Sequence, residues 1–392
     1  MTDAVIIDGA RTPFGKFGGS LKDVSATDLG VAAAKAALQR SNLEAGDIEH
    51  VVFGNVIQSS PDAIFIARHI GLKTGVPVGV PALTVNRLCG SGLEAIVTAA
   101  RLIRSGEAET VLAGGAENMS QIPFVVRGAR WGLPLGATPM RDYLWEALYD
   151  TYGRCTMSDT AERVAERYGI TREQADEHAL RSHRLAVEAI RSGRLRDEIV
   201  PVEVSDGKKA VIVDTDEHPR PDTTAESLSR LKPRFKENGV VTAGNASGLN
   251  DGAGAVVVTS ERYAEKKGLK PLARLVAWHT VGVEPELMGI GPVEAIRGAL
   301  RKAGLKLEDL DLIEINEAFS CQYLACQRLL GYNPDIGNVN GGAVALGHPL
   351  AASGARLVLT LLYELRRRNR KYGATAICIG GGQGIAAIWE RL

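Results

Sequence analysis

The sequence predicts an α/β protein built from two similar β-α-β-α-β halves, with a long segment inserted between them. Three observations support this fold class. An internal repeat relates the two ends of the 392-residue chain. Apolar residues in each copy alternate between helical and strand spacing. A turn-rich stretch with a different pattern separates the copies. Such alternation is typical of a parallel or mixed sheet with helices on both faces.

The repeat is clearest at an offset of 262 residues. Residues 33–55 and 295–317 each indicate an amphipathic helix, a turn and an apolar strand. The same offset pairs Ser91-Gly92 with Ser353-Gly354, each near the start of a long apolar helix. A third pairing, at a shifted offset, sets residues 111–117 against 378–384. We therefore expect two pseudo-symmetric halves that meet near the helix starts at 89–92 and 349–354.

The insertion and the domain limits follow from the repeat. We assign residues 1–118 plus 250–270 to the first half, 119–249 to an inserted loop domain, and 271–392 to the second half. The insertion should contain one strong helix near 171–191, which Thr171 begins and Gly193 ends. Residues 253–260 are apolar and β-branched, so they should return the chain to the first half as a strand.

Composition excludes several classes of protein. Hydrophobic residues make up 45% and charged residues 23% of a chain whose formal net charge is zero. A neutral chain is not expected to bind nucleic acid through a broad basic surface. No apolar stretch is long enough to suggest a membrane span, and no secretory signal is evident. The five scattered cysteines contain no C-x-x-C pair, so we expect no disulfide framework, no metal site and a reducing, cytoplasmic location.

Cys89 is the first candidate functional residue. It lies in Asn-Arg-Leu-Cys-Gly-Ser-Gly, directly before an apolar helical pattern, and small residues follow it. Unpaired backbone N–H groups and the helix dipole at such a position stabilise a thiolate. An acyl-accepting nucleophile needs this setting. The alternative is a buried structural cysteine, since free cysteine is often buried.

Three further residues could complete such a site. His348 lies on a glycine-rich loop before a helix expected near residue 350, where Pro349 suits the first helical position, and it could deprotonate a cysteine. Cys378 ends an apolar strand and could act as acid or base, while the glycine-rich turn after it could hold an oxyanion. Asn316 follows a buried strand and could position a water or orient an imidazole. Each has a purely structural alternative as a packed or turn-forming residue.

Together these motifs resemble the thiolase family. NRLCGSGLEAI, NEAFS, GGAVALGHPLAASGAR and CIGGGQGIA match its signatures in order, and the likeness extends from about residue 4 to 390. The resemblance implies a layered α-β-α-β-α core with a loop-domain insertion. It also implies the transfer of acyl groups between CoA thioesters, either as condensation with acetyl-CoA or as thiolysis of a 3-ketoacyl-CoA. CoA would be a substrate, with no permanently bound cofactor, and the chain would form a homodimer or homotetramer.

The resemblance assigns a role to each candidate. Cys89 would take the acyl group, His348 would activate it, and Cys378 would exchange a proton with Cα of acetyl-CoA. Asn316 and His348 would form one oxyanion hole, and the N–H groups of Cys89 and Gly380 the other. By the same resemblance, CoA would contact a set of residues mostly in or near the insertion: Leu148, Met157, Arg220, Phe235, Ala243, Ser247, Ala318 and Phe319.

Two positions depart from the short-chain biosynthetic pattern. Thr156 stands where many such members carry histidine. Gln383, in GGGQG, makes this motif resemble that of degradative 3-ketoacyl-CoA thiolases. Acyl chain length and direction therefore stay open. Two alternatives also stay open, namely a β-ketoacyl synthase-like condensing enzyme and an inactive acyl-CoA-binding relative. A dinucleotide-binding oxidoreductase is rejected, because Ile385 occupies the third glycine position of the only G-x-G-x-x-G-like run after a strand.

Overall fold

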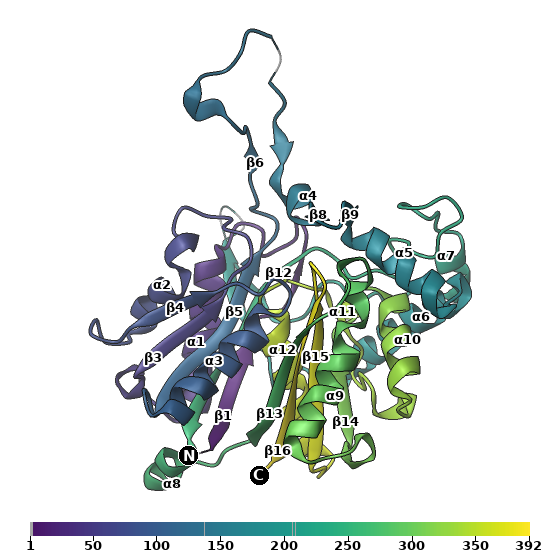
Figure 1. Ribbon diagram of the computed structural model, residues 1–392. Helices are drawn as coiled ribbons and strands as arrows, with labels where there is room; N and C mark the ends of the chain where they lie inside the picture. Colours follow the sequence, from purple (N-terminus) through teal and green to yellow (C-terminus); the bar gives the residue numbers. More distant parts are fainter. Residues whose placement is uncertain (1–2, 137, 206, 208) are drawn as a thin grey trace.

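A computed structural model describes residues 3–136, 138–205, 207 and 209–392. In this part of the chain one large sheet of ten strands runs through the molecule, and its two ends belong to the two halves of the repeat (Figure 1). The two halves of the sheet join where β1 pairs with β13 through Val5–Arg274 and Ile6–Ala273. Both chain ends lie on the same side of the molecule.

The first half of the sheet is mostly antiparallel. Its strands, in spatial order, are β1 (Ala4–Arg11), β12 (Asn250–Ser260), β5 (Thr110–Asn118), β3 (His50–Gly54) and β4 (Ala82–Val85). Strand β3 is parallel to β5 and β4, while β12 is antiparallel to β1 and β5. The short β2 (Gly15–Lys16) also pairs with β12. The strand expected at residues 253–260 is therefore confirmed as part of β12, and it does return the chain to the first half.

The second half repeats this arrangement. Its strands, in spatial order, are β13 (Ala273–Gly282), β16 (Gln383–Arg391), β15 (Tyr372–Ile379) and β14 (Leu312–Ile315). Strands β13, β16 and β15 are antiparallel, and β14 runs parallel to β15. The carboxyl ends of β14 and β15 therefore lie side by side, which brings Asn316 and Cys378 to one edge of the sheet.

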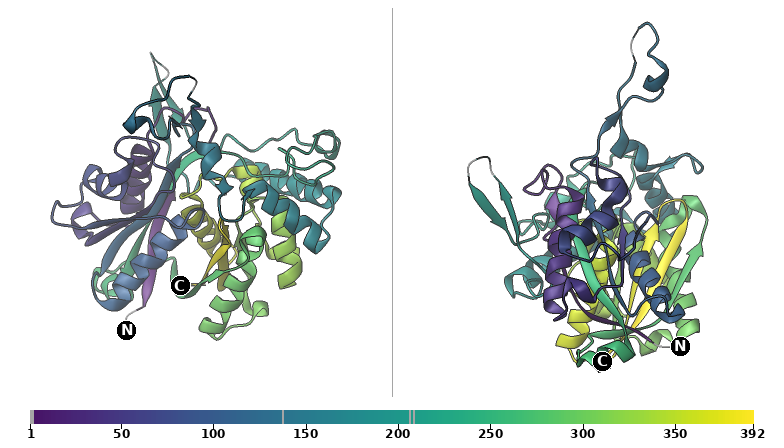
Figure 2. Two further views of the ribbon diagram at one scale, coloured as in Figure 1. Left: turned by 45° about the horizontal axis from the view of Figure 1, so that its top comes forward. Right: turned by 90° about the vertical axis from the view of Figure 1, so that its left-hand side faces the viewer.

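The helices and the two halves of the sheet together form five layers. In the middle, α3 (Ser91–Ser105) and α12 (Ser353–Arg367) pack on each other and on the two halves of the sheet. The outer face of the first half is covered by α1 (Ala26–Arg40) and α2 (Ile66–Thr74). The outer face of the second half is covered by α9 (Gly291–Ala303), beside which α10 (Ser320–Leu330) packs. This is the α-β-α-β-α core that the resemblance implied (Figure 2).

The repeat offset of 262 is visible in the element boundaries. Adding 262 to the limits of α3 gives the limits of α12, and β5 corresponds in the same way to β15. The pairing of residues 111–117 with 378–384 is wrong, because the strand that matches β5 starts at Tyr372. Gly92 and Gly354, also 262 apart, face each other where the central helices meet. A Cβ on Gly354 would lie 2.1 Å from the Leu93 nitrogen, so only glycine allows this approach.

The segment between the halves forms hairpins and helices around one end of the core. They are the hairpins β6 (Phe124–Val125) with β7 (Arg141–Asp142), β8 (Tyr149–Asp150) with β9 (Cys155–Thr156), and β10 (Val202–Ser205) with β11 (Ala210–Val213), and the helices α4 (Tyr143–Ala147), α5 (Met157–Tyr168), α6 (Arg172–Arg191) and α7 (Ala225–Ser229). The chain between β6 and β7 stands far away from the body (Figure 1). Helices α5 and α6 pack on α10. The numerical limits given above for the three domains stay a prediction.

Local signals explain the helices that the sequence predicted. Leu93, Ile96, Val97, Ala100 and Ile103 form the buried face of α3. Thr171 caps α6 through the N–H of Gln174, in the reciprocal arrangement that its sequence suggested. The expected helix start near residue 350 is wrong. Pro349 begins a turn instead, and α12 begins four residues later at Ser353. The glycine-rich loop before it also contains a short helix, α11 (Ala343–Leu346), which the sequence did not predict.

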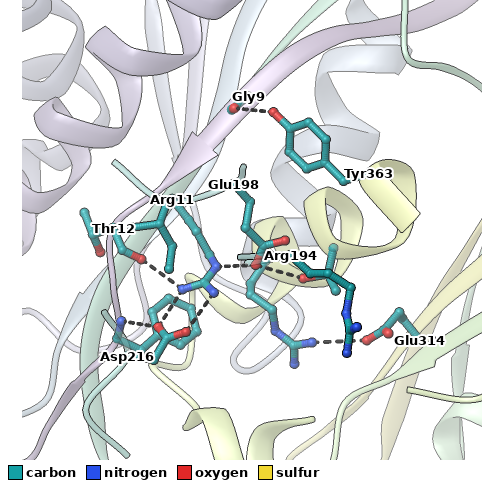
Figure 3. A network of polar contacts seen from close by, with 12 residues as sticks. Gly9, Arg11, Thr12, Arg194, Glu198, Asp216, Glu314 and Tyr363 are labelled. Atoms are coloured by element: carbon teal, nitrogen blue, oxygen red, sulfur yellow. Dashed lines mark hydrogen bonds and ion pairs between the residues drawn. The ribbon is translucent and has the colours of Figure 1, made fainter. Parts of the chain in front are cut away.

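A buried ionic network ties the insertion to the first half (Figure 3). The guanidinium of Arg11, at the end of β1, donates to Glu198 at 2.6 Å and to both oxygens of Asp216 at 2.7 and 2.9 Å. Thr360 of α12 donates to the same Glu198 oxygen at 3.1 Å. The partners of Arg11 therefore come from segments nearly 200 residues further along the chain. Among the described residues, no helix is both long and apolar enough to cross a membrane.

Candidate active site

Cys89 lies on a tight turn between β4 and α3. The preceding Leu88 has a φ of +46°, a left-handed conformation that is unusual for leucine. Asn86 Oδ1 accepts from the Leu88 N–H at 2.9 Å, and Ser91 Oγ donates to the Leu88 carbonyl at 2.6 Å. These bonds hold the strained residue in place. Strain of this kind is often found at functional sites, and no feature of the residue pattern predicted it.

Close backbone approach brings the two cysteine segments together. A Cβ on Gly90 would lie 2.7 Å from the Ile379 side chain, so the glycine lets the Cys89 turn pack against the end of β15. The backbone N–H of Gly380, directly after β15, favours the charged form of Cys89 and lowers its pKa. A charge on Cys89 would in turn raise the pKa of Cys378, which shows that the two sulfurs share one environment. The structure thus gathers three predicted residues, Cys89, Cys378 and Gly380.

The protonation state of Cys89 differs from the expectation. Burial raises the pKa of its thiol to about 11, although the N–H groups of Gly380 and Cys89 itself lower it. The nearby Glu117 carboxylate raises it further. Burial therefore opposes the expected thiolate, because the loss of hydration outweighs the two N–H groups at the start of α3. A thiol in this setting needs a base to act as a nucleophile.

Cys378 is more deeply buried than Cys89. It belongs to the apolar cluster that also contains Ala318, Phe319 and Met157. Burial raises the pKa of its thiol well above the ordinary value. A protonated thiol in an apolar wall can give its proton to a carbanion that forms beside it, and the resulting thiolate would be a strong base.

His348 is fixed by hydrogen bonds on its backbone and on its ring. Its N–H donates to Asn250 Oδ1 at 3.0 Å, and its Nδ1 lies 2.5 Å from Ser353 Oγ. Ser353 also donates to the Pro349 carbonyl at 3.1 Å. Because the hydroxyl has only one proton, Nδ1 must donate to Ser353, and Nε2 is left free to accept a proton.

The charge state of His348 suits this role. Burial lowers the pKa of the imidazole to about 3, and the Arg356 guanidinium lowers it as well. The ring is therefore neutral at physiological pH. A neutral imidazole beside a neutral thiol implies that proton transfer accompanies attack on a substrate and does not precede it.

Asn316 lies at the end of β14, as predicted, and contacts the imidazole. Its Nδ2 is 3.4 Å from His348 Nε2. Its own N–H donates to the Ala376 carbonyl at 2.9 Å, which places it beside the strand that carries Cys378. The Oδ1 atom is buried and has no hydrogen-bond partner among the described residues. An unpaired acceptor at this position can hold a water or a substrate N–H or O–H group.

Most of the predicted CoA contacts lie around these residues. Leu148 shares an apolar cluster with Cys89, and Met157 Sδ would be 3.1 Å from a Cβ on Gly380. Ala318 and Phe319 adjoin Cys378, and the Ser247 N–H donates to the Ala318 carbonyl at 3.0 Å. Phe235 and Ala243 are exposed on the segment before β12 and have no described contact with the cysteines.

Arg220 lies apart from the sulfurs, where two cavities meet. One, of about 1300 Å³, lies along α6 and α10, and the other, of about 490 Å³, adjoins Phe17 and Leu249. The described residues that line them do not include Cys89, His348 or Cys378. The Arg220 N–H donates to His183 Nδ1 at 3.2 Å. Arg220 can therefore contact only a part of a ligand that is remote from the reacting atoms.

Several residues of the site were missed by sequence reasoning. Ser353 and Asn250 set the position of His348, yet they look like ordinary residues of a helix start and a strand start. Thr156, noted as a departure, is the N-cap of α5 and accepts from the Asp159 N–H. Gln383 accepts from Arg87 in the Cys89 turn at 3.2 Å. The described residues contain no cluster of three His, Cys, Asp or Glu side chains suited to a metal ion.

Comparison with known proteins agrees with this geometry. Residues 4–262 match the family model "Thiolase, N-terminal domain", and residues 269–391 match "Thiolase, C-terminal domain". The chain is 50% identical over 387 residues to the mitochondrial 3-ketoacyl-CoA thiolase of Bos taurus, covering 98% of each chain. It is 49% identical over 393 residues to an acetyl-CoA acetyltransferase of Pseudomonas aeruginosa, covering both chains completely.

A solved structure with a bound ligand shows the same fold. Human mitochondrial 3-ketoacyl-CoA thiolase in complex with CoA superimposes with a TM-score of 0.97 at 49% identity, covering 100% of this chain and 98% of that one. These matches favour neither the β-ketoacyl synthase-like enzyme nor the inactive relative that the sequence left open. The chain belongs to the thiolase family and is an acyltransferase that uses CoA thioesters as substrates.

Proposed function

We propose that the enzyme works by a ping-pong mechanism through an acyl thioester on Cys89. In the thiolysis direction, Cys89 Sγ attacks the 3-keto carbon of a 3-ketoacyl-CoA while His348 Nε2 accepts the thiol proton. The Cα–Cβ bond then breaks, the acyl group stays on sulfur, and the enolate of acetyl-CoA takes a proton from Cys378. The neutral states of the thiol and the imidazole support a transfer that is coupled to attack.

The second half-reaction restores the starting state. The CoA thiol gives its proton to the Cys378 thiolate and attacks the acyl–Cys89 thioester. The shortened acyl-CoA leaves, and the Cys89 thiolate recovers its proton from His348. Asn316 and His348 would stabilise the enolate oxygen, and the N–H groups of Cys89 and Gly380 the tetrahedral oxyanion. The observation that carries this proposal is the packing of the Cys89 turn against the end of β15, where a Cβ on Gly90 would lie 2.7 Å from Ile379, the residue after Cys378.

The decisive experiment is to look for the acyl-enzyme. Wild-type protein mixed with a 3-ketoacyl-CoA without free CoA should gain one acyl group on the peptide that contains Cys89, as shown by mass spectrometry. Cys89→Ala should gain none, because no other cysteine lies at this helix start. Cys155→Ala is a matched control that removes a buried cysteine outside the site. An acyl group found on the Cys89→Ala protein would refute the assignment.

We also propose that the substrates include 3-ketoacyl-CoA chains longer than acetoacetyl-CoA. The curated relatives divide between 3-ketoacyl-CoA thiolases and acetyl-CoA acetyltransferases at nearly equal identity. Thr156 offers no imidazole at the acyl end, and its hydroxyl is occupied in capping α5. Thiolysis rates across 3-ketoacyl-CoA chains of four to sixteen carbons would test this. Activity on the four-carbon substrate alone would contradict it.

For CoA itself we propose an extended path from Cys89 to Arg220. Leu148, Met157 and Phe319 would contact pantetheine near the sulfur, and the Arg220 guanidinium would meet the phosphate or adenosine end. The cavities beside Arg220 support a nucleotide there. Arg220→Ala should raise KM for CoA and leave kcat nearly unchanged, because the contact is equal in the ground and transition states.

A homo-oligomer in a reducing compartment completes the proposal. Strand β4 is the last strand of the sheet, and Leu83 on it is 43% exposed, with Ile64, Phe65 and Val78 exposed nearby in the chain. An apolar edge strand of this kind can pair with a second copy.

All five cysteines are free, which supports the cytoplasm as the location. Fractionation of the source cells would test this location.

A further inference from the structure

Glu117 is a buried carboxylate that the mechanism above does not use. It lies near the end of β5 and is fully shielded from solvent. Its Oε1 accepts from Asn55 Nδ2 at 3.1 Å and from the Ile57 N–H at 3.0 Å. Its Oε2 accepts from the N–H groups of Val56 and Ala351, both at 3.1 Å. Four N–H donors saturate the acceptors of one carboxylate, and none of them could accept a proton from a carboxylic acid.

These four donors come from two separate segments. Asn55, Val56 and Ile57 follow β3 in the first half, whereas Ala351 belongs to the turn between His348 and α12. Glu117 therefore joins the two halves three residues from the imidazole. The side chain of a glutamate reaches all four N–H groups, whereas the shorter side chain of an aspartate would not reach both segments.

The other end of the His348 loop is held in the same manner. Glu317 accepts from Asn338 Nδ2 at 2.9 Å and from the Val344 N–H at 3.2 Å. One carboxylate thus fastens the loop before His348 and the other fastens it afterwards. They differ in environment, since His178 lies 3.1 Å from Glu317 whereas the hydrogen-bond partners of Glu117 are all neutral.

Glu117 also acts on the nucleophile through its charge. It raises the pKa of Cys89, and burial raises the pKa of Glu117 itself to about 7. The other ionisable group that acts on the sulfur is Cys378 on β15, whereas Glu94 on α3 is paired with Arg87 and Arg101. Removal of the Glu117 charge should therefore make Cys89 easier to ionise.

We propose that Glu117 is a positioning residue for catalysis, which holds the turn at Ala351, and with it His348, against the segment that follows β3. In its ionised form the same carboxylate disfavours the Cys89 thiolate. This inference rests on the proposed roles of Cys89 and His348. A carboxylate is needed because an amide at this position would turn an NH2 group towards two of the four N–H donors.

The test compares two variants that separate shape from charge. Glu117→Gln keeps the length of the side chain but removes the charge and opposes an NH2 group to two N–H donors, while Glu117→Asp keeps the charge and shortens the reach. Asp251→Asn is the matched control, since Asp251 is also fully buried and accepts from Ser120 in the turn after β5, but does not act on Cys89. Three quantities are measured. Steady-state kinetics give kcat and KM for CoA, and alkylation by iodoacetamide, located by peptide mass spectrometry, gives the pH midpoint of Cys89 ionisation.

Glu117→Gln should lower kcat by on the order of 10²-fold with little change in KM for CoA. It should also move the alkylation midpoint to lower pH by on the order of one unit. Glu117→Asp should lower kcat and leave the midpoint in place, and Asp251→Asn should change neither. An unchanged midpoint in Glu117→Gln, or a wild-type kcat in Glu117→Asp, would overturn the proposal.

Both variants remain informative if one is unstable. If Glu117→Gln does not fold, Glu117→Asp decides the positioning role by its kcat. Alkylation does not require turnover, so it still reports on the charge of Glu117 if the wild-type enzyme shows no thiolysis. Failure of the proposed function and failure of this inference are thereby distinguished.

Discussion

Cys89 and His348 form a pair of neutral partners at rest, and this state has consequences for the chemistry. Burial raises the pKa of the thiol to about 11 and lowers that of the imidazole to about 3. A preformed thiolate–imidazolium pair is therefore disfavoured in the free enzyme. A substrate carbonyl between the Gly380 N–H and the sulfur would supply the missing stabilisation, because negative charge moves to the oxygen as the sulfur attacks.

The two cysteines should separate functionally when one is removed. Cys378→Ala should still form the acyl–Cys89 thioester when given a simple acyl-CoA, since that step needs no proton at Cα. It should lose the condensation of acetyl-CoA, which needs a base there. Mass spectrometry measures the first reaction and a coupled assay the second. An equal loss of both would contradict the proposed division of roles.

Ser353 provides a test of how the imidazole is oriented. Ser353→Ala removes the partner of His348 Nδ1, so either ring nitrogen can carry the proton. We expect kcat to fall by up to about 10²-fold with KM for CoA unchanged. Ser105→Ala, which removes an exposed hydroxyl at the end of α3, is the control. Wild-type kcat in Ser353→Ala would show that the ring needs no such partner.

At the scale of elements, regular patterns were easier to predict than short ones. The apolar faces of α3 and α6 repeat over several turns, and capping residues mark the start of α6, so both helices follow from local physics. Residue 350 was three residues too early as the start of α12, because Pro349 opens a turn in which Ser353 contacts His348. Helix α11 is one turn in a glycine-rich run and carries no periodic signal.

The same distinction applies to the site. The types of its reactive residues were evident from motifs, and the structure gathers Cys89, Cys378 and Gly380 as expected. The pKa of Cys89 was not predictable, since it depends on burial and on Gly380 and Glu117, which lie far from it in the chain. Neither was Glu117, whose partners lie about 60 residues before it and more than 230 after it in the chain.

Helix α6 carries a histidine that should affect stability at acid pH. Burial lowers the pKa of His183 to about 4, and Arg220 lowers it further. Below pH 6.5 the unfolded chain binds a proton here that the folded protein does not, so stability falls as the pH decreases towards 4. Between these two pH values, His183 alone should lower the free energy of unfolding by about 1.4 kcal/mol for each pH unit.

His183→Gln removes this titration. The variant should be less stable than wild type at pH 7, because the ring is packed and accepts from the Arg220 N–H. The difference in stability between wild type and the variant should narrow as the pH is lowered from 6.5 to 4.5. Thermal unfolding of both proteins at several pH values would measure it. A constant difference would show that His183 does not titrate in this range.

At the scale of the whole molecule, the Arg11 network connects the insertion to the core. Arg11→Met would leave Glu198 and Asp216 buried without their cation. Loss of one partner from a buried ion pair typically costs about 3–5 kcal/mol, and we expect a loss of this size in chemical unfolding. Arg230→Ala, which breaks an exposed pair with Glu226, should change stability by less than about 1 kcal/mol. Similar small effects for both would contradict the structural role of the network.

The oligomer proposal makes a prediction at the β4 edge. Leu83→Lys places a charge on the exposed last strand, where it should prevent pairing with a second copy. Light scattering after gel filtration should give the mass of a single 41.7 kDa chain for the variant and a multiple of it for the wild type. Lys35→Glu, on the first-half helix α1, is a control for a change in surface charge. An oligomer of unchanged mass in Leu83→Lys would place the interface elsewhere.

The meeting of Gly92 and Gly354 has a consequence for stoichiometry. The position related to Cys89 by the same spacing of 262 is occupied by Ala351, and the counterpart of Cys378 is Ala116. Although the backbone is nearly twofold, its chemistry is one-sided: one copy supplies the nucleophile and the other the proton donor. Every polypeptide should therefore saturate at a single covalently attached acyl unit, because only the first copy carries the nucleophile.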